Sequence, residues 1–470
     1  MRNSRAMGVF LSIFAIISLS SCGGGASSSI DPNPQARTAN VFSVGTDAPL
    51  PSITACEITV TGVTIFNGTN DVPVMTQTPQ VIDFARLSGL HQLMDLNTVP
   101  TGTYSSATVT LANPPMISYI DTSVSPPIIA TVPNASLTVS TVKVNFAQSL
   151  MLNQNDTVGL RMEFDLRKSI QLDANGNVTG QVNPTFNMQL LAAGASDVSI
   201  DDFHAGFVGM GDNGAFTVQG PHGRQWTVQP SNSTVWDDPN IPVSSFTNNT
   251  ILSISGQLDP VTKDIDASEI EVVSMDGFFL GGLLTYVNPP SPQPATTVNL
   301  YVREELPDVV GLEPGDIESL TLDGSEQYRI ANIRNPLTTL LFNNTLLAAG
   351  QRVDIGGKVT TSNGLDTLTP HRVVLRRQGQ AGTWVPGSTQ VQSQNAGSFQ
   401  LNDQWTAGVL LPQPLTVLTT DDTNFINLSG LSGLTGANPI PIRVVGFILV
   451  NPEANYQPVF IARSVEQLND

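Results

Sequence analysis

Short segments rich in β-branched residues follow one another along almost the whole chain after residue 40. In residues 58–66, 104–111 and 142–146, Val, Ile and Thr alternate roughly with polar or small residues. Successive side chains of a strand point to opposite faces of a sheet, so this alternation predicts strands that bury one face. Turn-forming residues separate the segments, among them many of the 33 prolines and 39 glycines. The pattern predicts an all-β fold.

Only one kind of window hints at a helix, and it is short. Leu87, Leu90 and Leu93 follow one another at three-residue steps within residues 84–94, but Gly89 lies among them and disfavours a helix. We therefore expect an all-β chain, with an N-terminal β-sandwich followed by about three small OB-like β-barrel repeats.

The N-terminus has the parts of a secretory signal peptide. Two arginines precede an apolar run at residues 6–19, and small residues follow it. The run is shorter than the roughly 20 residues that a transmembrane helix needs. Leu19-Ser20-Ser21-Cys22 resembles the bacterial lipobox, which implies that the Cys22 thiol is lipidated and that Cys22 becomes the first mature residue. The alternative is an ordinary cleaved signal peptide with a chance cysteine.

The residues after Cys22 bear on location. Gly23 is not the aspartate that resembles an inner-membrane retention signal, so it favours an outer-membrane lipoprotein of the cell envelope. We expect a lipoprotein signal peptide at residues 1–21. Residues 22–40 are rich in Gly, Ser, Pro and Asn, and we expect them to form a flexible tether.

Composition excludes some partners and bounds the cysteine chemistry. The formal net charge is −19, which argues against nucleic acid and against adsorption to anionic lipid. The chain has 2 cysteines, so lipidation of Cys22 would leave Cys56 without an intramolecular disulfide partner. Cys56 lies in a segment that reads as a strand. A buried, inert thiol is the favoured interpretation, and a reactive thiol is the alternative.

Four blocks in the first 190 residues occur in an order that matches a known family. They are Val44-Gly45-Thr46-Asp47-Ala48-Pro49, the strand at 60–63, the turn Val99-Pro100-Thr101-Gly102-Thr103-Tyr104, and a closing block at 164–184. On these blocks residues 41–190 resemble the bacterial lipoprotein-associated domain of unknown function 4382. The Pro-rich stretch at 113–133 and the Asn183-Pro184 step depart from the family pattern. The resemblance implies a surface-exposed β-sandwich in secreted lipoproteins and carries no assigned activity. We place this domain at residues 41–195.

The second half of the chain shows weak self-similarity. Gly256, Gly356 and Gly446 occupy equivalent places in late strands, at spacings of 100 and 90 residues. A glycine inside a strand allows the sharp bend or bulge that a small closed barrel needs at its corners. The units resemble domain of unknown function 5666. We place β-barrel repeats at 201–275, 276–378 (diverged) and 379–470. The alternative is a run of unrelated hairpins with shared composition.

No catalytic constellation is recognisable in the sequence. The four histidines are His91, His204, His222 and His371, and no nucleophile elbow accompanies them. His204 could join two carboxylates at a metal, but the zinc spacings are missing. We interpret the acidic pairs, including Asp201-Asp202, Glu304-Glu305 and Asp421-Asp422, as solvated loop acids rather than calcium ligands. We therefore expect no catalytic residue, metal or cofactor.

The tryptophans raise a second functional possibility. Trp226, Trp236, Trp384 and Trp405 all lie in the repeat region, where exposed rings could stack on sugars, although core packing is the commoner fate. The leading hypothesis is a non-enzymatic interaction or structural lipoprotein of the envelope, held to a membrane by lipid on Cys22. Its partner would be an envelope protein or a glycan, not nucleic acid. The alternative is a carbohydrate- or polymer-binding lipoprotein. An enzyme of unfamiliar type is the third hypothesis.

Overall fold

The structure is a computed structural model. It describes residues 38–48, 53–75, 79–87, 92–121, 128–174, 177–192, 199–220, 225–237, 241–259, 262, 264–307, 312, 315–331, 341–362, 365–403 and 410–468. Cys22, the signal peptide at 1–21 and most of the tether lie outside these ranges. Within them, no helix is both long enough and apolar enough to cross a membrane. The single α-helix of the described residues is one turn, α1 (Leu166–Ser169).

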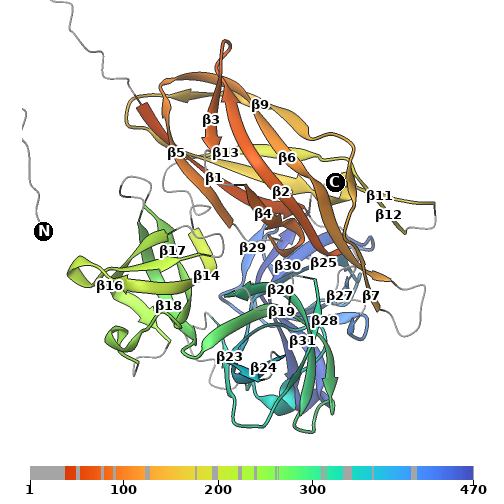
Figure 1. The fold of residues 1–470 in the computed structure, drawn as a ribbon. Coiled ribbons are helices and arrows are strands. Elements are labelled where there is room, and N and C mark those ends of the chain that lie inside the picture. Colours follow the sequence, from red (N-terminus) through yellow and green to blue (C-terminus); the bar gives the residue numbers. More distant parts are fainter. Residues whose placement is uncertain are drawn as a thin grey trace, which may run out of the picture.

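The N-terminal domain is a β-sandwich (Figure 1). One sheet has the order β13-β10-β1-β5 and the other has the order β3-β2-β6-β7, with β4 on β2 and β9 on β6. A small third sheet has the order β11-β12-β8. The strands are β1 (Thr38–Ala48), β2 (Ile53–Phe66), β3 (Asp71–Met75), β4 (Gln80–Asp83), β5 (Gln92–Pro100), β6 (Gly102–Asp121), β7 (Ile128–Val132), β8 (Ser136–Leu137), β9 (Thr141–Leu152), β10 (Thr157–Asp165), β11 (Ile170–Leu172), β12 (Val178–Val182) and β13 (Phe186–Ala192).

The two main sheets share one apolar core, to which the alternating strands contribute. Cys56 on β2 is fully buried there, which confirms the prediction of a buried thiol. Of the window at 84–94, residues Phe84–Leu87 form one 3-10 turn, η1, and residues 92–94 belong to β5. Tyr104, the third residue of β6, is fully buried, and its hydroxyl donates to the carbonyl of Pro100 at 2.8 Å. That bond closes the expected turn between β5 and β6.

The first repeat is a closed barrel, which we call unit 1. Its strand order is β14-β15-β16-β18-β17, and β16 runs parallel to β18. Because β17 also pairs with β14, the ring has no free edge. The strands are β14 (Ser199–Met210), β15 (Phe216–Gln219), β16 (Gln225–Trp236), β17 (Ile251–Leu258) and β18 (Ile265–Ser274), with 3-10 turns η3 (Asp212–Gly214) and η4 (Val243–Ser245).

The next two units repeat this connectivity. Unit 2 has the order β21-β20-β19-β23-β24-β22, and unit 3 has the order β25-β30-β31-β28-β27-β26 with β25 also paired to β27. The β25–β27 pairing closes the ring in unit 3, whereas the strand order of unit 2 ends at β21 and β22. Among the described residues of unit 2, no pairing joins β21 to β22, so a closed ring is recorded for units 1 and 3.

Units 2 and 3 contain the remaining strands and turns. In unit 2 these are β19 (Gly277–Asn288), β20 (Thr297–Leu306), β21 (Ile317–Thr321), β22 (Gln327–Ile330), β23 (Arg352–Ser362), β24 (Leu365–Leu375) and η5 (Asn344–Leu346). In unit 3 these are β25 (Gln378–Trp384), β26 (Gln390–Val391), β27 (Gly397–Asp403), β28 (Leu415–Thr419), β29 (Asn424–Ile426), β30 (Pro441–Asn451), β31 (Gln457–Gln467), η6 (Leu431–Gly433) and η7 (Pro452–Ala454).

The three equivalent glycines each lie at a register shift of the antiparallel pairing. The shifts are at Ser255/Gly256, Gly356/Gly357 and Val445/Gly446. A Cβ added to Gly256, Gly356 or Gly446 would come within 2.2, 2.1 or 1.9 Å of a backbone carbonyl oxygen. The prediction that these glycines permit bulges is confirmed, and the reason is backbone approach rather than an unusual φ.

The sandwich and the three units pack against one another (Figure 1). Unit 3 residues such as Phe447 and Leu449 belong to the same apolar cluster as the core of unit 2. The sandwich contacts unit 2 through Ala55, Met116 and Ile129, which surround Tyr301. Met116 and Ile129 come from the Pro-rich stretch that departs from the family pattern. That stretch therefore helps to join the sandwich to the repeats.

Candidate functional site

A cluster of buried ionisable side chains lies where units 1 and 2 meet. Strand β14 supplies two members, β18 and β20 supply one each, and β23 supplies two, while the last comes from the link between β24 and β25. Six of the seven residues are less than a tenth exposed, and the remaining side chain is 12% exposed. We call this cluster the junction network: Asp202, His204, Glu271, Glu304, Arg352, Asp354 and Arg376.

His204 is the centre of the junction network. Its Nδ1 lies 3.2 Å from Oε2 of Glu304, and its Nε2 lies 2.8 Å from Oδ2 of Asp354. An ionised carboxylate only accepts hydrogen bonds, so both ring nitrogens must donate, which requires the imidazolium form. The ring also stacks on Phe279, with centroids 4.2 Å apart. A cation against an aromatic face adds further stabilisation.

Arg376 is the second cation at the centre. Its Nε donates to Asp354, and its Nη1 lies 2.8 Å from Oε2 of Glu271 and 3.4 Å from Oδ1 of Asp202. Arg376 therefore links β14 and β18 of unit 1 to β23 of unit 2. Arg352 adds charge at 3.9 Å from Oδ2 of Asp202.

Local backbone geometry aims the β14 side chains at unit 2. A register shift separates Ile200 from Phe203 in the β14–β17 pairing, and Asp202 has a φ of 50°. Aspartate tolerates the left-handed region better than most residues do. Asp202 lies within this bulge and His204 follows it, and Asp202 contacts Arg352 and Arg376 while His204 contacts Asp354. The bulge thus places both side chains at the junction.

Burial and neighbouring charges shift the pKa values of the junction network in opposite directions. Burial alone would lower the pKa of His204, but the carboxylates of Asp354 and Glu304 outweigh it and raise the pKa to about 9. Burial would raise the pKa of Asp354, yet Arg376 and His204 hold it below its usual range. Burial raises the pKa of Glu271 to about 7, against the opposing effect of Arg376. Near pH 7, the His204 imidazolium and the Arg376 guanidinium therefore face the Asp354 carboxylate and a partly protonated Glu271.

This arrangement is suited to holding the units together. Removing one member of a buried, paired set leaves the others with uncompensated charge, which is strongly destabilising. Arg372 extends the junction by donating to the carbonyl of Val272, and the hydroxyl of Ser274 donates to the carbonyl of Gly357 at 3.2 Å. The ionisable groups at this junction are thus used between units.

The structure corrects two readings of acidic pairs. Asp202 and Glu304 are not solvated loop acids, because both lie on strands and contact buried cations or His204. His204 does meet two carboxylates, but these are Glu304 and Asp354 rather than its sequence neighbours. Within the described residues, no group of three or more His, Cys, Asp or Glu side chains is arranged to hold a metal.

The other candidate residues are not brought to this junction network. His371 lies on the surface, 2.8 Å from Asp276, and Asp421 and Asp422 are exposed in a turn. His91 and His222 lie outside the described residues. Sequence reasoning did not single out Glu271, Asp354 or Arg376. A charged residue between two apolar ones, as in Val353-Asp354-Ile355, was the signal available in a chain with only 13% charged residues.

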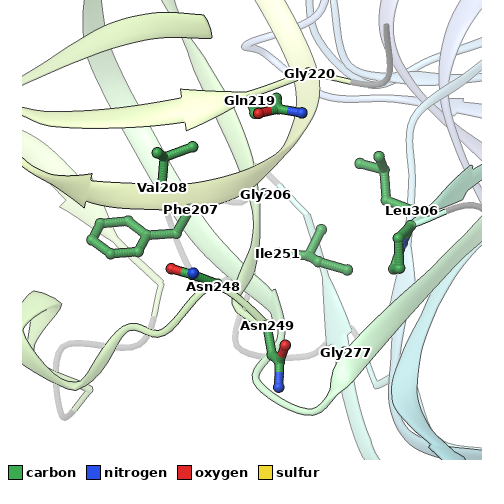
Figure 2. A pocket seen from close by; sticks show the side chains of 11 residues that line it. Gly206, Phe207, Val208, Gln219, Gly220, Asn248, Asn249, Ile251, Gly277 and Leu306 are labelled. Atoms are coloured by element: carbon green, nitrogen blue, oxygen red, sulfur yellow. The ribbon is translucent and has the colours of Figure 1, made fainter. Parts of the chain in front are cut away.

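A groove lies between units 1 and 2, lined among others by residues of β14, β17 and β20. It has a volume of about 400 Å³, and none of the described residues that line it is charged. Figure 2 shows the side chains of Gln219, Asn248 and Asn249 at this pocket, together with Ile251 and Leu306. Ile251 and Leu306 belong to one apolar cluster, so the wall that they form is a continuation of the core.

A second groove lies between units 2 and 3 and is also lined by uncharged residues. It encloses about 310 Å³. Tyr286 on β19 is 50% exposed there, and Tyr456 precedes β31. Thr285 and Gln457 contribute polar groups beside the two rings. We call this site the tyrosine groove.

The tryptophans do not provide the exposed platform that sugar stacking on them would need. Trp226 and Trp384 are 7% and 1% exposed, and Trp236 is half-buried. Trp226 and Trp384 belong to the apolar cores of units 1 and 3, as expected for core packing. Trp405 lies outside the described residues.

Comparison with known proteins identifies one region of the chain. Residues 42–180 match the model of a domain of unknown function, DUF4382, which confirms the resemblance of the N-terminal sandwich. No curated protein matches the chain. No solved structure matches it either.

Proposed function

We propose that the chain is a membrane-anchored lipoprotein, facing the surface or the periplasm, that acts as a non-enzymatic interaction or structural module of the cell envelope. The observation that carries the proposal is the use made of the ionisable groups. His204 and its carboxylate partners are buried between units, whereas the described residues that line the two grooves above are uncharged.

The packing supports a rigid body rather than a flexible array. The sandwich joins unit 2 around Tyr301, unit 2 shares its core with unit 3, and the junction network joins unit 1 to unit 2. A rigid body can present preformed grooves without the entropy loss of ordering loops on binding. This rigidity suits a structural role, and it equally suits binding of a ligand in a groove.

Metabolic labelling with palmitate tests the anchor. Wild type is expected to carry the label and to fractionate with membranes, whereas Cys22→Ala should lose the label and enter the soluble fraction. Cys56→Ala is the matched control, because Cys56 is a buried thiol in β2 and should not affect labelling. An unlabelled wild-type protein would contradict the lipoprotein proposal.

Capture from envelope extracts tests the interaction role. Cys22→Ala provides soluble bait, and a specific envelope protein or polymer should be retained under physiological salt. A second bait with both Tyr286→Ala and Asn249→Ala asks whether the grooves are used. Equal recovery on both baits would count against a role for the grooves.

The second candidate function is a carbohydrate- or polymer-binding lipoprotein. The half-exposed Tyr286 favours it, because an aromatic ring with one free face can stack on a sugar ring while its hydroxyl forms hydrogen bonds.

A further inference from the structure

We propose that the tyrosine groove binds an uncharged glycan, with a sugar ring stacked on Tyr286 and its hydroxyls bound by the polar groups around it. The inference rests on the carbohydrate-binding form of the proposed function and gives it a site. Three independent features of the groove support it: the aim of Tyr286, the backbone of Tyr456 and the chemistry of the lining.

Tyr286 is directed outward by a β-bulge. In the β19–β20 pairing, Leu284 faces Leu300 and Tyr286 faces Asn299, so Thr285 is an extra residue. The Thr285 hydroxyl donates to the carbonyl of Asn299 at 3.3 Å and holds the bulge. Bulges are common next to binding sites because they redirect a side chain. The result is a large aromatic residue that is 50% exposed, although Leu284 and Val287 on the same strand are buried.

Tyr456 has a backbone conformation that tyrosine rarely adopts. Its φ is 56°, and the preceding Asn455 has a φ of 50°. Asparagine tolerates this left-handed region, but a bulky residue there is an outlier. Strained residues of this kind gather at binding sites, where the side chain repays the strain through function. Glycine would adopt this conformation without strain, whereas this position carries a tyrosine that lines the groove.

The lining suits a neutral polyhydroxylated ligand. Among the described residues, none that lines the groove is charged, and the protein has a net charge of −19, which disfavours anionic ligands. Gln457 offers an amide that both donates and accepts, as sugar hydroxyls do. Pro290, Pro412 and Pro458 supply an apolar wall for the C–H faces of the rings.

The groove is preformed. The Gly350 amide donates to the carbonyl of Leu284 at 2.7 Å, next to the bulge. The Gln351 amide donates to the carbonyl of Ile448 at 3.1 Å and ties unit 2 to unit 3 beneath the groove. The groove between units 1 and 2 is less suited to a sugar ring, because its apolar wall belongs to the core. None of the described residues that line it is a half-exposed aromatic.

The experiment uses the full chain with Cys22→Ala as the soluble parent. An array of uncharged oligosaccharides, with sulfated and uronic-acid oligosaccharides and a proline-rich peptide alongside, identifies the ligand class. Calorimetric titration with the best uncharged oligosaccharide then compares variants. Tyr286→Ala is expected to weaken binding about tenfold or more, and Tyr286→Phe, which keeps the ring, by less than about threefold.

Tyr456→Gly separates function from stability. It should weaken binding about tenfold while the Tm stays the same or rises, because glycine adopts a positive φ without strain. Ile317→Ala, at a residue 48% exposed on β21 of the same unit, is the control and should leave binding unchanged.

Several results would overturn the proposal. These are no binding to any uncharged oligosaccharide, preference for an anionic one or for the proline-rich peptide, or equal affinity of Tyr286→Ala and its parent. A lower Tm for Tyr456→Gly would remove the argument from strain. Failure of the lipoprotein proposal is separate, since it is read from palmitate labelling and not from binding.

Discussion

Replacing His204 with glutamine should abolish a loss of stability that the wild-type protein undergoes in mild alkali. The imidazolium of His204 is buried between Glu304 and Asp354, and its pKa is raised from 6.5 to about 9. A group whose folded pKa lies above its unfolded value stabilises the fold fully below the unfolded pKa. That contribution is lost as the pH rises through the folded pKa. For His204 the window therefore runs from pH 6.5 to about 9.

The magnitude follows from the size of the shift. A pKa shift of one unit corresponds to about 1.4 kcal/mol, so this shift corresponds to ~3 kcal/mol of stability. The side chain of His204 is fully buried, so solvent screening does not reduce the figure. Domains are stable by only about 5–15 kcal/mol, so such a loss is readily measured. Glu271 adds a second pH dependence at lower pH. Its pKa is raised to about 7, so its contribution to stability is lost as the pH rises from 4.5 to 7.

Scanning calorimetry at four pH values between 6.5 and 9.5 is a suitable assay. Wild type should lose several degrees of Tm across this range, while His204→Gln should start lower and change much less. His371→Gln is the matched control, because His371 faces Asp276 with both side chains about half exposed. Titrations common to all three proteins cancel in the comparison. If wild type and His204→Gln lose Tm in parallel, the assignment of a buried imidazolium is refuted.

Three further substitutions test the packing. Arg376→Met should lower the free energy of unfolding by about 3–5 kcal/mol in denaturant titration, because it leaves buried carboxylates without a cation. Its control, Arg443→Ala, removes a half-buried pair with Glu466 and should lower the free energy of unfolding by about 1 kcal/mol or less. Gly446→Ala should destabilise the fold by about 1–3 kcal/mol, because the added Cβ would lie 1.9 Å from a carbonyl oxygen. Its control, Gly62→Ala, should change stability by less than about 0.5 kcal/mol, because a Cβ there would have nothing within 4 Å. Tyr104→Phe should cost about 1 kcal/mol by removing the bond to the Pro100 carbonyl, and an unchanged midpoint would show that this bond is dispensable.

Local features of the chain were predictable because their signals are local. Alternation in residues 58–66 indicates a half-buried strand, and β2 spans them. Residue type alone predicts the turn at residues 99–104 and the bulges at Gly256, Gly356 and Gly446. Few other residues permit a tight turn or such a close approach of two backbones. Closure of each barrel was harder to predict, because it depends on whether two edge strands meet. Among the described residues of unit 2, no pairing joins the two ends of the strand order.

The candidate sites depend on contacts that periodicity does not encode. His204 meets Asp354 across 150 residues of sequence and Glu304 across 100, and Arg376 meets Asp202 across 174. Nothing in the neighbourhood of His204 in the sequence names these partners. Its apparent neighbour Asp202 pairs with an arginine of another unit instead. Whether a charged residue is solvated or buried depends on which surface packs over it, and that is settled only when the units dock.

The same division holds for the grooves. The sequence shows that tyrosines, prolines and amides occur in the repeats, and it predicts the strands that carry them. Only docking of unit 2 on unit 3 places Tyr286 and Tyr456 around one groove, and only the bulge at Thr285 turns the Tyr286 ring to solvent. Strand formation follows from local periodicity and turn chemistry. Burial, ionisation and ligand access follow from long-range packing, because they depend on surfaces that come together from distant parts of the chain.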